Sequence, residues 1–227
     1  MEHRGKEIAI VGAGGFGREV LWLARCVAKR YGAPSVVGFL DDNPQLHGKV
    51  ICDAPVLGGL DWLEGPVRES IQVVLGIGEP SVKRRVVIRI EKLGLEGYSL
   101  IHPTCQMSSF VELGEGAIIA TGSVLTTQVL FGRWVTVNLN CTIGHDVVVG
   151  DCCTLAPGTH LSGRVVLEEG VKIGTGAVVL PGVRIGKWTT VGAGAVVAKD
   201  LPSRVVAVGV PAKVVRTKSE DESVCEE

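Results

Sequence analysis

The sequence has few aromatic residues, almost no net charge and no long apolar run. Aromatic side chains make up 4% of the 227 residues, and the formal net charge is −1. A near-neutral chain gives no electrostatic reason to expect nucleic acid or an anionic membrane as its main partner. No apolar stretch reaches the ~18 residues of a transmembrane helix without a charge or glycine interrupting it. We therefore expect no membrane span.

Secretion signals and cysteine frameworks are also missing. The N-terminus has neither the apolar core nor the cleavage site of a signal peptide. The 7 cysteines are odd in number, and their spacings fit neither a disulfide framework nor a zinc knuckle. Cys152 and Cys153 are adjacent, which suits packing better than bridging. We expect a cytoplasmic protein with reduced thiols and no metal.

Glycine is abundant, with 31 residues, and half of the chain has a strict period of six. From Ile101 to Val197 every sixth residue is large and apolar, and the residue after it is usually small. Neither a helix nor an ordinary strand has this period. A hexapeptide repeat is the signature of a parallel β-helix, in which one apolar side chain per flat face points inward. The inward positions are Ile101, Met107, Leu113, Ile119, Leu125, Phe131, Val137, Ile143, Val149, Leu155, Leu161, Leu167, Ile173, Val179, Ile185, Val191 and Val197.

The first hundred residues have a different pattern, in which apolar strands alternate with amphipathic helices. This alternation predicts a small Rossmann-like α/β domain over residues 1–100, with a parallel sheet and helices on both faces. The repeat domain covers residues 101–202. Residues 203–227 form a C-terminal segment with a strand pair, a turn at 209–211 and an acidic tail that we expect to be disordered. The expected N-terminal elements are strands at 7–12, 35–43 and 71–78 and helices at about 18–29 and 80–93.

A glycine-rich loop joins the first strand to the first helix. Gly12, Gly14 and Gly17 form the pattern G-x-G-x-x-G, which lets backbone amides approach a phosphate at a helix N-terminus. Asp41 and Asp42 end the second strand, where a carboxylate can accept a ribose hydroxyl. One nucleotide diphosphate is the economical ligand, because about 100 residues leave no room for two mononucleotide halves. A dinucleotide and a purely structural turn are the alternatives.

Of the 5 histidines, His145 has the setting best suited to chemistry. It follows the inward Ile143 by two positions, so it lies near a corner of the coil, with Asp146 next to it. A neutral imidazole can take a proton from an attacking amine or hydroxyl, and a carboxylate can orient the ring. The alternative is a surface His-Asp pair at a turn.

Several motifs together resemble one family over nearly the whole chain. They are IAIVGAGGFGREV, FLDDN, GIGEP, LIHPT, GHD and GVPAK. This combination resembles the NeuD family of sugar O-acetyltransferases, and within it the nucleotide-sugar N-acetyltransferases related to PglD and the perosamine N-acetyltransferases. The resemblance implies a left-handed β-helix with three hexapeptides per coil, a homotrimer, and active sites between neighbouring subunits.

The resemblance also implies roles for individual residues. His145 is the implied general base, Asp146 tunes it, and Asn138 lies in the same pocket. Acetyl-CoA is the implied co-substrate. Many relatives have histidine at the position of Phe16, and some have a second histidine at the position of Thr154, which retains a hydroxyl donor. The implied acetyl-CoA contacts are Thr154, Gly163 (whose amide polarises the thioester carbonyl), Gly174, Thr175, Gly192, Ala193, Pro211 and Lys213. The implied nucleotide-sugar contacts are Gly12, Gly14, Phe16, Gly17, Asp41, Asp42, Gly76 and Gly78.

The expected function is acetyl transfer from acetyl-CoA to the amino group of a nucleotide-linked 4-amino-4,6-dideoxy sugar. His145 takes the amine proton directly, and neither a metal nor an acyl-enzyme is needed. One alternative is an O-acetyltransferase of the sialic acid type, which uses the same base and coenzyme. Another is a non-catalytic hexapeptide-repeat binding protein. A hexapeptide acyltransferase acting on serine or a lipid precursor fits less well, because it leaves the N-terminal domain unexplained.

Overall fold

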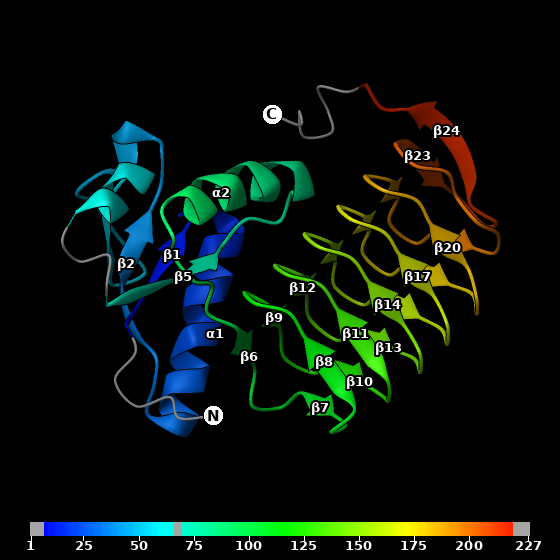
Figure 1. The fold of residues 1–227 in the computed structure, drawn as a ribbon, viewed down its shortest axis with the longest axis horizontal. Coiled ribbons are helices and arrows are strands. Elements are labelled where there is room, and N and C mark those ends of the chain that lie inside the picture. Colours follow the sequence, from blue (N-terminus) through cyan, green and yellow to red (C-terminus); the bar gives the residue numbers. More distant parts are fainter. Residues whose placement is uncertain (1–6, 66–69, 220–227) are drawn as a thin grey trace.

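The computed structural model of the chain describes residues 7–65 and 70–219. Within these ranges it has two parts, an α/β domain followed by a stack of coils (Figure 1). The acidic tail, for which we expect disorder, lies outside the described residues from position 220 onward.

The N-terminal domain contains a five-stranded sheet in the order β3-β4-β2-β1-β5. All neighbouring strands are parallel except β3, which runs antiparallel to β4. One mononucleotide-type half is therefore present, as the length of the domain predicts. The strands are β1 (Glu7–Val11), β2 (Ser35–Leu40), β3 (Val50–Ile51), β4 (Ala54–Gly58) and β5 (Ile71–Leu75), and the short helices are η1 (Pro44–Leu46) and η2 (Leu60–Glu64).

Two helices cover opposite faces of this sheet, as expected. α1 (Gly15–Tyr31) packs with Ile10 and Phe39, and α2 (Pro80–Lys92) packs with Val11 and Val73. α1 begins three residues before the predicted start at Arg18, because extended Gly14 caps it and the chain is helical from Gly15. Pro80 occupies the first turn of α2, where its missing N–H costs nothing.

The repeat domain confirms the predicted β-helix. Strands pair in parallel with strands 18 residues away, as in Leu125 with Ile143, so three hexapeptides make one coil. Their stacking produces three flat sheets, which we call the first, second and third faces, and the solenoid is left-handed. The C-terminal strand pair, β23 (Val205–Val208) and β24 (Lys213–Thr217), is also confirmed and extends the first face.

The coil strands are two or three residues long. The first face contains β6 (Leu100–Ile101), β9 (Ile118–Ile119), β12 (Thr136–Val137), β15 (Thr154–Leu155), β18 (Lys172–Ile173) and β21 (Thr190–Val191). The second contains β7 (Gln106–Met107), β10 (Val124–Leu125), β13 (Thr142–Ile143), β16 (His160–Leu161), β19 (Val178–Val179) and β22 (Val196–Val197). The third contains β8 (Val111–Leu113), β11 (Val129–Phe131), β14 (Val148–Val149), β17 (Val166–Leu167) and β20 (Arg184–Ile185).

The inward positions form one continuous core, with an exception in the first coil. From Ile119 to Val197 every sixth residue is buried, whereas Met107 is 40% exposed. Met107 keeps the inward register, because it pairs with Leu125, but it is not buried in the core. β7 is the first strand of its sheet, so no coil covers that side of the side chain. Ile101 and Leu113 are half-buried for the same reason.

Buried thiols contribute to this core. Cys141 and Cys153 are fully buried, and burial raises the pKa of Cys141 to about 11 and that of Cys153 to about 12. Such thiols remain protonated and inert at neutral pH. Among the described residues, no helix is long and apolar enough to cross a membrane, and no cluster of His, Cys, Asp and Glu has a metal-binding arrangement.

Candidate active site

The candidate residues lie on two different edges of the three-sided solenoid. Asn138 follows β12, so it lies between the first and second faces, on what we call the Asn138 edge. His145 follows β13, so it lies between the second and third faces, on the His145 edge. α1 and α2 contact the first face. The His145 edge is therefore opposite the N-terminal domain of its own chain.

On the His145 edge, the predicted contact between His145 and Asp146 is present. The imidazole Nδ1 lies 2.7 Å from Asp146 Oδ2. Asp146 has a φ of 58°, in the left-handed region that aspartate tolerates better than most residues, and this turn brings its carboxylate beside the preceding side chain. With Nδ1 donating to the carboxylate, the neutral ring presents the lone pair of Nε2 outward.

Gly163 lies directly beneath this imidazole, one coil further along. A Cβ at Gly163 would approach the His145 ring to well under 3.0 Å, so only glycine fits under the ring as it stands. The Gly163 carbonyl accepts a hydrogen bond from the Gly182 N–H at 3.0 Å. The Gly163 N–H has no acceptor within the described part of the chain. A free base nitrogen and a free backbone amide thus lie side by side.

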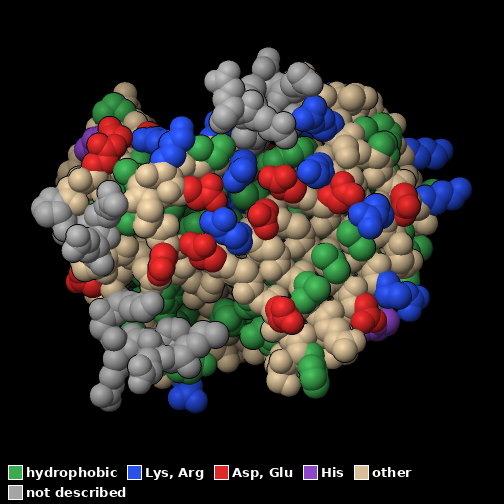
Figure 2. All heavy atoms as spheres, in the orientation of Figure 1, with side chains coloured by type: hydrophobic (Ala, Val, Ile, Leu, Met, Phe, Trp, Pro, Cys, Tyr) green, Lys and Arg blue, Asp and Glu red, His purple; other side chains and the backbone are tan. Residues whose placement is uncertain are grey.

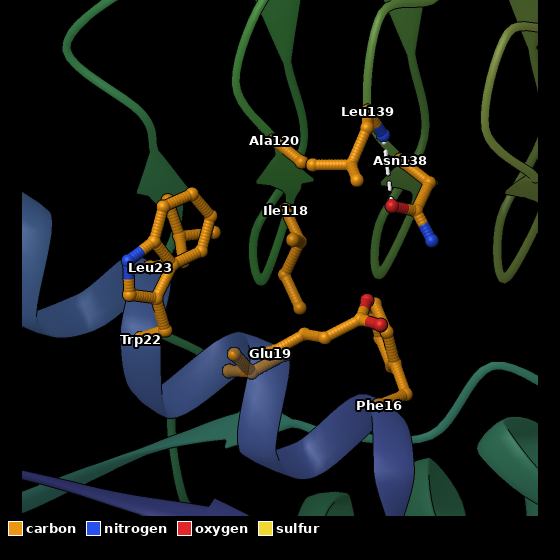
Figure 3. Close-up of a pocket in the computed structure, with 9 residues that line it drawn as sticks. Phe16, Glu19, Trp22, Leu23, Ile118, Ala120, Asn138 and Leu139 are labelled. Carbon is orange, nitrogen blue, oxygen red and sulfur yellow. Dashed lines mark hydrogen bonds between the residues drawn. The ribbon is translucent and has the colours of Figure 1, made fainter.

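The Asn138 edge faces α1 across a small pocket of about 140 Å³ (Figure 3). Its walls are mostly apolar, and Glu19 and Asn138 supply the polar groups. The Asn138 Oδ1 accepts a hydrogen bond from the Leu139 N–H at 2.8 Å, which fixes the amide plane and leaves the NH₂ group as a donor. The pocket is lined by Phe16, Glu19, Val20, Trp22, Leu23, Ile118, Ala120, Asn138 and Leu139.

The residues implied in acetyl-CoA binding divide between the two edges. Gly163 is on the His145 edge, whereas Gly174 and Thr175 follow β18 and Gly192 and Ala193 follow β21, on the Asn138 edge. A Cβ at Gly174 would clash with the Ala193 amide, so this part of the Asn138 edge is narrow and made of small residues. Pro211 and Lys213 lie beyond it, where the Ala212 N–H bonds the Val196 carbonyl at 2.8 Å. One chain does not bring the two sets together.

The predicted coenzyme contact of Thr154 has no support in this geometry. The side chain lies on the first face, is only 6% exposed, and its hydroxyl accepts a hydrogen bond from Lys83 at 3.0 Å. The threonine is sealed beneath α2, far around the solenoid from the His145 edge. We interpret Thr154 as part of the junction between the two domains, and its coenzyme contact stays a prediction.

The glycine loop combines close packing with an open anion site. Gly12 and Gly17 pack so tightly that a Cβ on Gly17 would overlap the Gly12 carbonyl, and Gly76 packs against both. Gly14 and Gly78, by contrast, have open space where a side chain would be. The first turn of α1 has no side-chain cap and no acidic residue. Its unpaired amides and the helix dipole favour a phosphate there.

The two aspartates after β2 have structural partners. Asp41 accepts the N–H groups of Ala13 and Asn43, both at 2.9 Å, and so holds the glycine loop in place. Asp42 accepts from Arg89 at 2.6 Å and from the Leu60 N–H at 3.1 Å. Burial alone would raise the pKa of Asp42, but the Leu60 N–H and the Arg89 guanidinium outweigh burial and lower it. A ribose contact of either carboxylate stays a prediction.

Other groups near the site were not predicted from the sequence. Glu19 lines the pocket from one turn after Phe16, and the periodicity of α1 gave the only available signal for it. Lys83 is a fully buried lysine on α2, which no sequence pattern indicates. Of the other histidines, His102 stacks on Trp22 and His160 bonds Thr142, so both have structural contacts.

Comparisons with known proteins identify relatives of both parts of the chain. Residues 7–90 match the family model of the PglD N-terminal domain, and residues 164–199 match that of the bacterial transferase hexapeptide. The chain is 32% identical over 201 residues to the GDP-perosamine N-acetyltransferase of Escherichia coli O157:H7, covering 88% of this chain and 81% of that protein.

Solved structures show the same fold over most of the chain. PerB from Caulobacter crescentus, solved with CoA and GDP-perosamine, is 30% identical, with a TM-score of 0.84 over 94% of this chain and 99% of that one. The acetyltransferase domain of PglB from Neisseria gonorrhoeae, solved with acetyl coenzyme A, is 28% identical, with a TM-score of 0.84 over 93% and 100%. The chain belongs to the PglD-like family of hexapeptide-repeat sugar acetyltransferases.

Proposed function

We propose that this protein transfers an acetyl group from acetyl-CoA to the amino group of a nucleotide-linked 4-amino-4,6-dideoxy sugar. One observation carries the proposal: His145, oriented by Asp146, presents Nε2 next to the unpaired Gly163 amide. Acyl transfer needs this combination of a base for the nucleophile and a donor for the oxyanion. The GDP-perosamine N-acetyltransferase of Escherichia coli O157:H7 and PerB, which was solved with GDP-perosamine, support an amino-sugar acceptor.

The reaction follows from these groups. The sugar amine attacks the thioester carbonyl while His145 Nε2 takes its proton, and the Asp146 carboxylate stabilises the imidazolium that forms. The negative charge that develops on the carbonyl oxygen accepts a hydrogen bond from the Gly163 N–H. Collapse of the tetrahedral intermediate breaks the carbon–sulfur bond, and the imidazolium protonates the departing thiolate. All bonds are exchanged without an acyl-enzyme.

A homotrimer completes the site. His145 and Asp146 have 53% and 46% of their side-chain surface exposed, so water is not excluded in a single chain. The glycine loop lies on the opposite side of the solenoid, and Asn138 and the small-residue edge are separated from His145 by the width of the second face. Threefold packing of the solenoids puts the His145 edge of one subunit against the Asn138 edge of the next. Acetyl-CoA then lies between them, and the sugar reaches across from the neighbour's N-terminal domain.

Thiol release from acetyl-CoA tests the proposed function. We expect release with nucleotide-linked 4-amino-4,6-dideoxy sugars and far less with their 4-hydroxy counterparts. Preference for the hydroxyl sugar establishes the O-acetyltransferase alternative. The absence of both release and an acetyl-CoA-dependent thermal shift establishes a non-catalytic binding protein.

A charge change at Gly14 tests the phosphate site. Asp is a favourable helix cap and has room at this position, so we expect Gly14→Asp to fold with unchanged or higher thermal stability. Its carboxylate occupies the place of the phosphate and repels it, which raises the KM for the nucleotide sugar roughly tenfold or more while the KM for acetyl-CoA stays constant. Steady-state kinetics with each substrate varied separately measure both values.

Gly14→Asn is the matched control, because it has the same shape and capping ability without the charge. A KM for the nucleotide sugar that is the same in Gly14→Asp and Gly14→Asn contradicts a phosphate at this helix terminus.

A further inference from the structure

Lys83 is an unusual residue at the junction between the two domains. It lies in the first turn of α2, is 0% exposed, and its side chain points into the first face of the solenoid. Its Nζ donates to four oxygens, Trp134 O at 3.0 Å, Thr136 Oγ1 at 2.9 Å, Cys153 O at 3.2 Å and Thr154 Oγ1 at 3.0 Å. These acceptors are more than enough for the three N–H groups of an ammonium.

No carboxylate among the described residues forms an ion pair with this ammonium. Lysines are almost never fully buried without such a partner, because desolvation of the charge is costly. Burial lowers the pKa of Lys83 to about 8, with Cys152, Cys153 and Glu79 acting in the opposite direction. The four oxygen acceptors around Nζ favour the protonated form of the side chain. An apolar side chain of similar length would fill this space at a lower cost in desolvation free energy, but it would not fix the orientation of α2 on the solenoid.

The four hydrogen bonds join two segments that both belong to the acceptor side of the proposed site. On one side, α2 begins two residues after Gly78, the end of the open nucleotide loop. On the other side, Thr136 begins β12, and Asn138 directly follows this strand. Lys83 thus joins, by hydrogen bonds, the helix that follows the nucleotide loop to the strand that precedes Asn138.

In the described structure, the other polar side-chain contacts of α2 and the preceding Glu79 with the solenoid are at the surface. They are the ion pairs Glu79–Lys172, Arg84–Glu169 and Glu91–Arg133, whose side chains are about 30–44% exposed. Acidic and basic side chains alternate over this part of the molecule without a patch of one sign (Figure 2). Exposed pairs contribute little and tolerate several geometries. Among these contacts of α2, the buried ammonium constrains the orientation of the helix most closely.

We propose that Lys83 is a positioning residue, which holds the nucleotide loop at a fixed distance from Asn138 and thereby places the acceptor sugar for the neighbour's His145. This inference rests on the proposed function for its kinetic consequence. A positioning role differs from a purely stabilising role because its loss should weaken binding of the nucleotide sugar but not of the free nucleoside diphosphate. In the proposed site the nucleotide sugar contacts both domains, whereas a nucleoside diphosphate contacts only the N-terminal domain.

Comparing Lys83→Met with Arg84→Met in the full-length protein tests the proposal. Methionine keeps the volume and removes the donors, whereas Arg84 belongs to an exposed pair in the same helix turn. For Lys83→Met we expect the KM for the nucleotide sugar to rise roughly tenfold, as misplacement of a substrate by a fraction of an ångström does. The inhibition constant of the free nucleoside diphosphate and the KM for acetyl-CoA should change less than about twofold, as should all three values in Arg84→Met.

Two further measurements test the proposal even if Lys83→Met fails to fold or if no amino sugar is acetylated. Thr136→Val with Thr154→Val removes two acceptors and keeps the lysine, and it should give the same kinetic split. Amide hydrogen exchange can be measured without turnover. Its rate should rise in both segments, 76–80 and 136–139, in whichever of these variants folds. It should stay unchanged in Arg84→Met. Unchanged exchange in these segments overturns the proposal. An equal loss of sugar-nucleotide and free-nucleotide binding overturns it as well, because that pattern indicates general destabilisation.

Discussion

His145→Ala should lower the turnover number by about 10² to 10⁴, the usual contribution of a positioned general base. The side chain is half exposed on the single chain and makes its one described hydrogen bond to Asp146, so its removal should leave the coils intact. The KM for acetyl-CoA should change little, because the coenzyme contacts that we infer are made by backbone groups and by residues on the Asn138 edge, not by the His145 side chain. Thiol release at saturating concentrations of both substrates measures the effect, and circular dichroism and sedimentation check fold and assembly.

His160→Ala is the matched control. His160 is another exposed histidine of the solenoid, on the second face one coil further along, and its ring contacts only the Thr142 hydroxyl in the described structure, at 2.8 Å. We expect near-normal turnover for this variant. Near-normal turnover by His145→Ala would contradict the assigned base.

Gly163→Ala should be nearly as damaging as loss of the histidine itself. The added methyl group would overlap the imidazole, and the histidine, whose side chain is exposed, can swing away at little cost to the fold. We therefore expect an almost unchanged melting temperature together with a fall in turnover of roughly 10²-fold, the effect of misplacing a catalytic group by about an ångström. Thermal unfolding and steady-state kinetics on the same preparation measure the two quantities.

A double-mutant cycle separates this effect from a loss of the Gly163 amide. If the methyl group acts by displacing His145, it should cause little further loss in the His145→Ala background. If the double variant instead loses turnover by the product of the two single-variant factors, alanine disturbs the oxyanion donor independently of His145. Ser162→Ala controls for the removal of a small polar group at the same corner.

Much of this architecture could be predicted from the sequence, for identifiable physical reasons. Inward residues of a solenoid recur at a fixed spacing, so the register of every coil from Ile119 to Val197 follows from counting. The contact of His145 with Asp146 was predictable because both residues occupy one tight turn. The exposure of Met107 was not predictable, because a periodic pattern does not show that the first coil lacks a covering neighbour on this face.

Other parts depend on contacts between segments far apart in the chain. The resemblance placed Thr154 near the coenzyme, whereas α2 covers it through Lys83, a contact 71 residues distant in sequence. Asp41 was expected to face a ribose, yet its carboxylate is engaged by the amides of its own loop. Nothing in the residue spacing distinguishes a carboxylate that orders a loop from one that binds a ligand.

The central claim is that each active site combines the His145 edge of one subunit with the N-terminal domain of its neighbour, and mixed trimers test it most directly. His145→Ala and Gly14→Asp should each be almost inactive at nucleotide-sugar concentrations below the wild-type KM. Random trimers assembled from equal amounts of the two should recover about a quarter of the wild-type activity, because half of the subunits retain the base and half of their neighbours retain the phosphate loop. Mixtures that stay as inactive as the separate variants, after mass spectrometry has verified that the subunits have exchanged, would contradict the claim and place the whole site within one chain.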